Sequence, residues 1–163
     1  MSDLAHLDEE GRVSMVDITE KSTSYRRARA RAVVEFPEGE LTEILEEGLE
    51  KGELFATIRL AGIQAAKKTP ELIPLTHPIN LSHVQVEICS RPVENLLKIE
   101  VTASARDATG VEMEALTGAS AAALTAYDMC KGRTKGIKIK AVKLLEKEGG
   151  ASGDWQASEL EEK

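Results

Sequence analysis

The feature that most constrains the fold is the strict alternation of side chains in YRRARARAVVEF, residues 25–36. Small or apolar residues occupy every second position, and mostly charged residues fill the positions between them. A period of two places these sets on opposite faces of an extended chain. The sequence therefore predicts a half-buried strand that ends at Pro37 and Gly39. Its core face carries Ala28, Ala30, Ala32, Val34 and Phe36.

The other periodic segments follow in an order that selects one topology. In chain order, two helical segments, two alternating strands, a third helix and a last strand are predicted over residues 41–51, 52–68, 83–90, 96–107, 110–132 and 137–147. The first helix is therefore long or broken. The resulting β-α-β-β-α-β order predicts a ferredoxin-like α+β fold, in which helices cover one face of an antiparallel sheet.

Length and composition bound the organisation of the chain. Its 163 residues suit one domain, which we place at 15–155 between a flexible N-terminal arm at 1–14 and a polar tail at 156–163. No apolar run approaches the roughly 20 residues of a membrane helix, and the polar start MSDLAHLDEEGR is unlike a signal peptide. Cys89 and Cys130 form neither a CxxC pair nor a zinc spacing. We therefore expect a cytoplasmic protein with reduced thiols and no membrane contact.

The charge of the chain restricts its partners. A net charge of −7 and an aromatic content of 3% disfavour a binder of DNA or RNA, which needs a positive field and stacking surfaces. Basic residues nevertheless gather at 26–31 and at 131–143. We expect most of them on solvated strand faces, and the alternative is a local anion site for a small phosphorylated substrate.

The segment GVEMEALTGASAAALTAYDMCKG, residues 110–132, predicts a helix with small residues in its middle and reactive groups at both ends. Acids first and lysine last also suit the helix dipole. Glu114 and Asp128 lie 14 positions apart, which is about 21 Å along the axis, so the two ends cannot surround one small group. They serve separate purposes, bind opposite ends of a long substrate, or are each completed by a second subunit. We favour an oligomer with a shared site, in which the small middle allows close packing between subunits.

Three further polar residues stand in unusual places. His77, in LIPLTHPIN, lies in a loop fixed by prolines and is either a structural histidine or a proton carrier. Lys51 precedes Gly52 after an acidic helix, so it is either a helix-end charge or a hinge lysine that reaches a phosphate. Asp17, in MVDIT, either caps a turn or holds an arginine. His77 and His83 have no convincing third ligand, so we expect no zinc site.

Four stretches resemble one known family. They are MVDIT followed by an arginine, KGELFATIRLAGIQAAKKTPELIPLTHPI, GVEMEALTGASAAALTAYDMCK and EGGASGDW. They are similar to the molybdenum cofactor biosynthesis C proteins, which are cyclic pyranopterin monophosphate synthases, and the likeness runs from Met15 to Trp155. The resemblance implies a ferredoxin-like fold, in agreement with the order of elements. It also implies a homohexamer, built as a trimer of dimers with sites at the dimer interface.

The resemblance further implies a lyase reaction. The substrate would be (8S)-3′,8-cyclo-7,8-dihydroguanosine 5′-triphosphate, a cyclised dihydro-GTP that a radical SAM GTP cyclase supplies. The products would be cyclic pyranopterin monophosphate and pyrophosphate. No resident cofactor is implied, and it stays open whether Mg²⁺ accompanies the triphosphate.

The matching motifs carry the family's site residues onto this chain. DMCK implies Asp128 and Lys131 as catalytic residues, with Lys131 as general acid and base. Whether pairing with Asp128 raises the pKa of Lys131 or its surroundings lower it stays open. The implied substrate-binding set is Lys51, Leu75, Thr76, His77, Glu112, Met113, Glu114 and Arg26. Within this set, Lys51 and Arg26 would hold phosphates, and the two glutamates would accept N–H groups of the base.

Three points stay open at the level of sequence. Arg27 is adjacent to Arg26, so the register of the implied arginine is not fixed. This chain has Thr76 where many members have cysteine, and Ala151 where many have the lysine of GGKSG. A hydroxyl still forms hydrogen bonds, whereas the second departure removes one anion-binding lysine unless another replaces it. The competing function is a small-molecule sensor, since ferredoxin-like folds also serve as binding modules.

Overall fold

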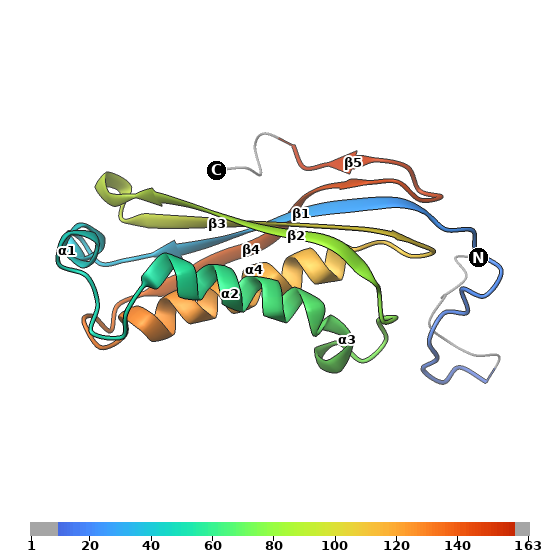
Figure 1. The fold of residues 1–163 in the computed structure, drawn as a ribbon, viewed down its shortest axis with the longest axis horizontal. Coiled ribbons are helices and arrows are strands. Elements are labelled where there is room, and N and C mark those ends of the chain that lie inside the picture. The colour runs from blue at the N-terminus through green and yellow to red at the C-terminus, as the bar shows by residue number, and fades with distance from the viewer. Residues whose placement is uncertain (1–9, 159–163) are drawn as a thin grey trace.

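Two layers make up the part of the chain that the structure, a computed structural model, describes, residues 10–158. An antiparallel sheet forms one layer, and the long helices α2 and α4 lie side by side on one of its faces (Figure 1). In chain order the elements are β1 (Ser24–Glu35), α1 (Glu40–Glu47), α2 (Leu54–Lys67), α3 (Thr69–Leu72), β2 (Leu81–Arg91), the 3₁₀ turn η1 (Pro92–Glu94), β3 (Leu96–Asp107), α4 (Glu112–Cys130), β4 (Lys138–Glu148) and β5 (Trp155–Gln156). The predicted α+β fold of the ferredoxin-like type is confirmed.

The sheet has the order β2-β3-β1-β4-β5, so β1 lies in its centre. Ala30 of β1 is paired with Val101 of β3 on one side and with Leu144 of β4 on the other. The predicted core face of β1 is confirmed, because every one of its five residues is buried. The short edge strand β5 was not predicted, and it pairs with the end of β4 next to the predicted boundary at residue 155.

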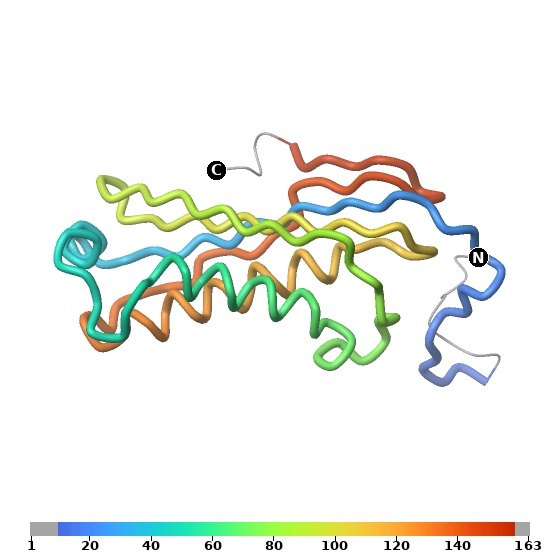
Figure 2. The backbone as a smooth tube through the Cα atoms, in the orientation of Figure 1, coloured from blue at the N-terminus to red at the C-terminus, as the bar shows by residue number. Residues whose placement is uncertain are grey.

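The predicted long or broken helix is broken. α1 ends at Glu47 and α2 begins at Leu54, and the loop between them contains Gly48 and Gly52, which both have positive φ angles. Figure 2 shows this loop at the same end of the molecule as the turn that follows α4. Residues 10–23 lie at the opposite end. The chain thus gathers different loops at the two ends of α4.

Small residues bring α2 and α4 into close contact. A Cβ atom at Gly118 of α4 would lie 3.0 Å from the carbonyl oxygen of Gly62 of α2 and 3.0 Å from Val101 of β3. Ala119 and Ala122 are fully buried at the same level. The small middle of α4 therefore packs within the chain. This covers one face of the helix, whereas Leu124 on another face is 61% exposed, so the predicted packing of α4 between subunits stays a prediction.

Three arginines of β1, Arg27, Arg29 and Arg31, form a ladder of ion pairs on the other face of the sheet. Arg29 pairs with Glu100 of β3 and with Glu146 of β4, both at 3.1 Å. Arg31 also pairs with Glu100, at 2.6 Å, and Arg27 pairs with Glu146. This basic cluster lies on a strand face, as the sequence favoured, and acidic partners neutralise it.

The ends of the chain are described in part. Residues 1–9 of the predicted arm and residues 159–163 of the predicted tail lie outside the described residues. Asp17 caps a turn, because its Oδ1 accepts hydrogen bonds from the backbone N–H and the hydroxyl of Thr19, at 2.8 and 2.6 Å. None of the helices formed by residues 10–158 has the length and apolar character needed to cross a membrane.

Candidate active site

At the C-terminal end of α4, one carboxylate lies between two ammonium groups. Asp128 Oδ1 is 2.6 Å from Lys131 Nζ, and Asp128 Oδ2 is 3.1 Å from Lys51 Nζ. Lys51 reaches in from the α1–α2 loop and also donates to the backbone carbonyl of Asp128, at 2.6 Å. The i,i+3 spacing places Asp128 and Lys131 on one helix face, whereas only the tertiary fold adds Lys51.

This pairing sets the charge state of both partners. The hydrogen bond from Lys131, and after it that from Lys51, lowers the pKa of Asp128. In turn, the hydrogen bond to Asp128 raises the pKa of Lys131. The side chains are 57% and 54% exposed, so water and salt screen the pair. Pairing thus outweighs burial, and Lys131 is an ammonium group that can donate a proton.

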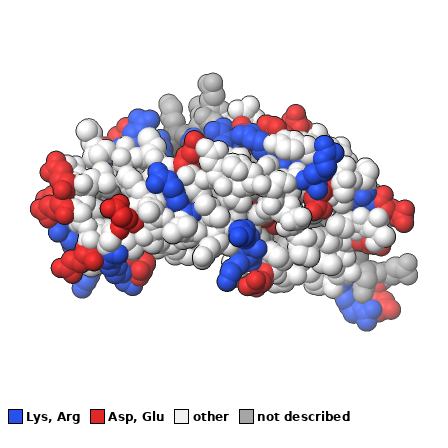
Figure 3. All heavy atoms as spheres, in the orientation of Figure 1, with Lys and Arg blue, Asp and Glu red and all other residues white. Residues whose placement is uncertain are grey.

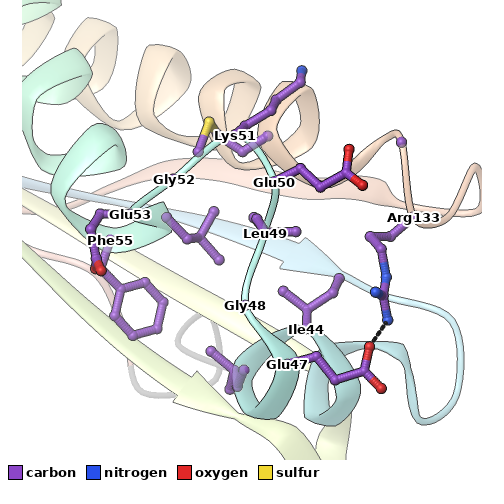
Figure 4. A pocket seen from close by; sticks show the side chains of 14 residues that line it. Ile44, Glu47, Gly48, Leu49, Glu50, Lys51, Gly52, Glu53, Phe55 and Arg133 are labelled. Atoms are coloured by element: carbon purple, nitrogen blue, oxygen red, sulfur yellow. Dashed lines mark hydrogen bonds and ion pairs between the residues drawn. The ribbon is translucent and has the colours of Figure 1, made fainter.

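A cavity of about 850 Å³ opens beside this cluster. In Figure 4 the loop that carries Lys51 crosses the view between α1 and α2. Apolar side chains such as Ile44, Leu49 and Phe55 line the cavity together with Lys51 and Arg133. A cavity of this size can hold a nucleotide-sized ligand.

At the N-terminal end of α4, a second cavity of about 390 Å³ collects most of the other predicted residues. The first turn of α4 forms one wall, and the LIPLTHPIN loop and residues near Val16 and Lys21 form others. Of the predicted substrate-binding set, this cavity is lined by Leu75, Thr76, His77, Glu112, Met113 and Glu114. The Thr76 hydroxyl donates to the carbonyl oxygen of Ile73 at 2.9 Å, so it helps to shape the loop.

Glu114 is the most unusual side chain of this cavity. It is 2% exposed, and within the described range, residues 10–158, neither of its carboxylate oxygens has a hydrogen-bond partner. Burial raises the pKa of Glu114 to about 7, and the charges of Glu112 and Asp107 add to this effect. A buried carboxyl without a partner is destabilising. The site therefore suits a ligand that brings N–H donors to this carboxyl.

Arg26 lies at the same end of α4. Its guanidinium donates to the carbonyl oxygens of Asp107 and Ala108, both at 3.3 Å. Gly150 has φ 93°, a conformation that favours glycine, and a Cβ atom there would lie 1.9 Å from Arg26 Nη1, so a glycine suits the turn that closes over the arginine. Arg27 points to the opposite face, where it pairs with acidic residues of β4. The geometry therefore favours Arg26 in the register that the sequence left open.

Three basic residues near the two cavities were missed as candidates. Lys147 Nζ lies 3.2 Å from Glu112 Oε1 and 2.9 Å from Ser152 Oγ, so it brings an ammonium group to the turn that contains Ala151. Lys21 lines the smaller cavity and Arg133 the larger one. Arg133 was visible only as a member of the basic cluster expected on a strand face. No sequence pattern marked Lys21 or Lys147, because strand pairing and loop closure bring them to the site.

Within one chain the predicted site residues form two separate half-sites. Lys51, Asp128 and Lys131 make the first, at the C-terminal end of α4. His77, Arg26 and the EME segment make the second, at its N-terminal end. The two predicted phosphate ligands, Lys51 and Arg26, are therefore not brought together. This confirms the separation of the two ends of the helix that its length predicted.

Comparison with known proteins shows the family to which the chain belongs. The model that describes the MoaC family matches residues 15–150, a range that contains both half-sites. The chain belongs to the MoaC family. It is 50% identical over 154 residues to a protein from Geotalea uraniireducens (strain Rf4), covering 94% of this chain and 96% of that relative. It is 49% identical over 156 residues to a protein from Chloroflexus aggregans (strain MD-66 / DSM 9485), covering 96% of this chain and 94% of that relative.

Both MoaC family relatives are named cyclic pyranopterin monophosphate synthase. The similarity to each relative covers more than nine-tenths of this chain. Among residues 10–158, no group of three or more histidine, cysteine, aspartate and glutamate side chains is placed to hold a metal ion.

Proposed function

We propose that this MoaC family protein is a lyase that makes cyclic pyranopterin monophosphate. Its substrate is the cyclised dihydro-GTP, (8S)-3′,8-cyclo-7,8-dihydroguanosine 5′-triphosphate, and its second product is pyrophosphate. The observation that carries the proposal is the pair of half-sites on a chain about half identical to two named synthases. One half-site offers ammonium groups to a triphosphate, and the other offers an unpaired carboxyl to a base.

The reaction must rebuild the ring system and displace pyrophosphate from the α-phosphate. A bound substrate makes the attack of a sugar hydroxyl on that phosphate an oriented intramolecular step. We assign Lys51 to the triphosphate, where its ammonium group offsets the negative charge of the leaving group. Lys131 is the general acid and base. It begins the reaction as a proton donor because its hydrogen bond to Asp128 raises its pKa and favours the ammonium form. Any Mg²⁺ that the reaction uses arrives on the triphosphate rather than on a resident metal site.

The second half-site would recognise the base. Glu114 and Glu112 accept hydrogen bonds from the N–H groups of the guanine-derived ring. For Glu114 this contact supplies the partners that its buried oxygens lack. His77 shuttles a proton or contacts the base, and Arg26 adds a fixed positive charge for a phosphate.

A complete site needs both half-sites around one substrate, so we propose that two subunits share it. One subunit would supply Lys51, Asp128 and Lys131, and the other would supply His77, Arg26 and the EME glutamates. We further propose that three such dimers form a homohexamer in the cytoplasm. We also propose that a radical SAM GTP cyclase supplies the substrate, which is a cyclised nucleotide. Light scattering tests the assembly, and a monomeric mass would contradict a shared site.

One assay separates the synthase from the competing small-molecule sensor. The purified protein is incubated with the cyclised dihydro-GTP, and released pyrophosphate is measured together with the pterin product. A synthase releases one pyrophosphate for each cyclic product, whereas a sensor binds the nucleotide and leaves it intact. Binding without turnover would therefore reject the proposed function.

A further inference from the structure

One ion pair lies across the cavity beside Lys51. Arg133 Nη2 is 2.7 Å from Glu47 Oε2 and 3.9 Å from Glu43 Oε2. Figure 4 shows the guanidinium of Arg133 directed toward Glu47. Figure 3 shows acidic and basic side chains next to each other around this end of the molecule. Since Arg133 follows α4 and Glu47 is the last residue of α1, the pair ties these two helices together.

The segment that follows Glu47 is the loop that carries Lys51. Gly48 has φ 79° and ψ −173°, and Gly52 has φ 96°, which are conformations that glycine adopts far more readily than other residues. A Cβ atom at either glycine would meet no atom within 4 Å, so neither glycine lies in a tight contact. The backbone N–H groups of Gly48 and Gly52 donate to the carbonyl oxygens of Ile44 and Leu49, both at 3.0 Å, and Leu49 packs against the core. The loop is therefore a short span with a glycine near each end. Besides the packing of Leu49, polar contacts at both of its ends set the position of Lys51.

Two polar contacts hold this loop. Lys51 bonds to Asp128 at the end of α4, and Glu47 bonds to Arg133 just before the first glycine. The Arg133 turn itself is fixed, because the Arg133 N–H donates to the carbonyl oxygen of Cys130 at 2.9 Å. Both contacts thus anchor the α1–α2 loop to the same part of the chain, which is the C-terminal end of α4 and the turn that follows it.

We propose that Arg133 is a positioning residue, which holds Glu47 and thereby sets where Lys51 stands over the C-terminal end of α4. This inference rests on the proposed role of Lys51 as a ligand of the triphosphate. Arg133 itself does not touch the substrate. When the Arg133–Glu47 pair is lost, the loop samples more positions, and the fraction of molecules with Lys51 ready for the phosphates falls.

A different role for the same residue predicts the opposite sign at Glu47. If Arg133 bound a phosphate directly, Glu47 would compete with the substrate for the guanidinium. Removing the Glu47 charge would then tighten substrate binding. In a positioning role, by contrast, Arg133 and Glu47 act through one contact, so losing either has the same effect as losing both.

The test compares Arg133→Gln, Glu47→Gln and the double variant. Because the pair is exposed, we expect each single variant to raise KM about two- to fivefold with kcat unchanged, and the double variant to match them. Arg133→Lys, which keeps the charge, should recover part of the loss. Hydrogen exchange of the amides at 48–53 should become faster in the Gln variants.

Matched controls come from an ion pair of similar exposure between two strands. Lys140 Nζ lies 3.2 Å from Glu35 Oε2, with side chains 49% and 33% exposed, against 38% and 61% for Arg133 and Glu47. Lys140→Gln and Glu35→Gln carry the same charge changes and should leave KM and loop exchange unchanged.

Three results would overturn the proposal: tighter binding in Glu47→Gln, additive effects in the double variant, or loop exchange equal to that of the unmodified protein. The role of Lys51 is tested separately by Lys51→Ala. If that variant keeps a normal KM, the assignment of Lys51 fails, and loop exchange still decides whether Arg133 holds the loop.

Discussion

At the C-terminal end of α4, Asp128 is exposed and lies between two ammonium groups. At the N-terminal end, Glu114 is buried, and neither of its carboxylate oxygens has a partner in the part of the chain that the structure describes. Neighbouring cations lower the pKa of the first carboxyl, and burial raises that of the second to about 7. At the first end the carboxylate is paired and the cluster keeps a net positive charge, whereas at the second end the carboxyl lacks hydrogen-bond partners among residues 10–158. One helix therefore presents two different chemical environments, and in the proposed shared site each substrate would contact one end of α4 in one subunit and the other end of α4 in its partner.

The largest expected effect comes from removing the proposed general acid, Lys131, at the C-terminal end of α4. Lys131→Ala should lower kcat for pyrophosphate release by about 10²–10⁴-fold, the usual contribution of a general acid or base. The fold should persist because the side chain is 54% exposed. A pyrophosphate assay measures the loss, and circular dichroism checks the fold. Lys135→Ala, in the turn that follows, is the matched control and should retain activity. Normal turnover by Lys131→Ala would remove this residue from the mechanism.

The second prediction concerns whether the C-terminal end of α4 in one subunit and the N-terminal end of α4 in another form one site. Lys131→Ala and His77→Ala proteins should each be nearly inactive alone. When they are unfolded and refolded together, mixed dimers contain one site with both residues intact, and activity should rise to about a quarter of that of the unmodified protein. Co-refolding two preparations of Lys131→Ala is the control. A mixture as inactive as its components would show that each chain builds its own site.

The smallest effect concerns the buried end and appears in stability. The folded pKa of Glu114, about 7, exceeds its ordinary value of 4.5, so the folded state binds more protons between these pH values. The free energy of unfolding should therefore fall as pH rises from 4.5 to 7, by about 2–3 kcal/mol from this group. Glu114→Gln removes this loss, which urea unfolding at pH 5 and pH 8 measures. Glu94→Gln, on an exposed turn, should follow the unmodified protein. If the free energy of unfolding of Glu114→Gln changed with pH in parallel with that of the unmodified protein, the Glu114 carboxyl would be ionised throughout this pH range.

The fold could be predicted from local patterns because its central elements are strongly periodic. The alternation of β1 marked its core face, and a run of residues from 96 to 107 was predicted as a strand with the bounds that β3 has. Two features escaped. β5 is only two residues long, too short for a period. The small residues of α4 indicated close packing, but their partner, α2, could be identified only from the tertiary structure.

The sequence by itself determined the order of elements, the distance between the two ends of α4 and the residue types at each end, because helix rise and side-chain period are local properties. Only the tertiary structure decided which groups are neighbours. It brought Lys51 to Asp128 across 77 positions, and it buried Glu114 where no residue among 10–158 bonds to its carboxylate oxygens. Desolvation and ion pairing depend on what surrounds a group in space, so the charge states of this site arise only when the chain folds.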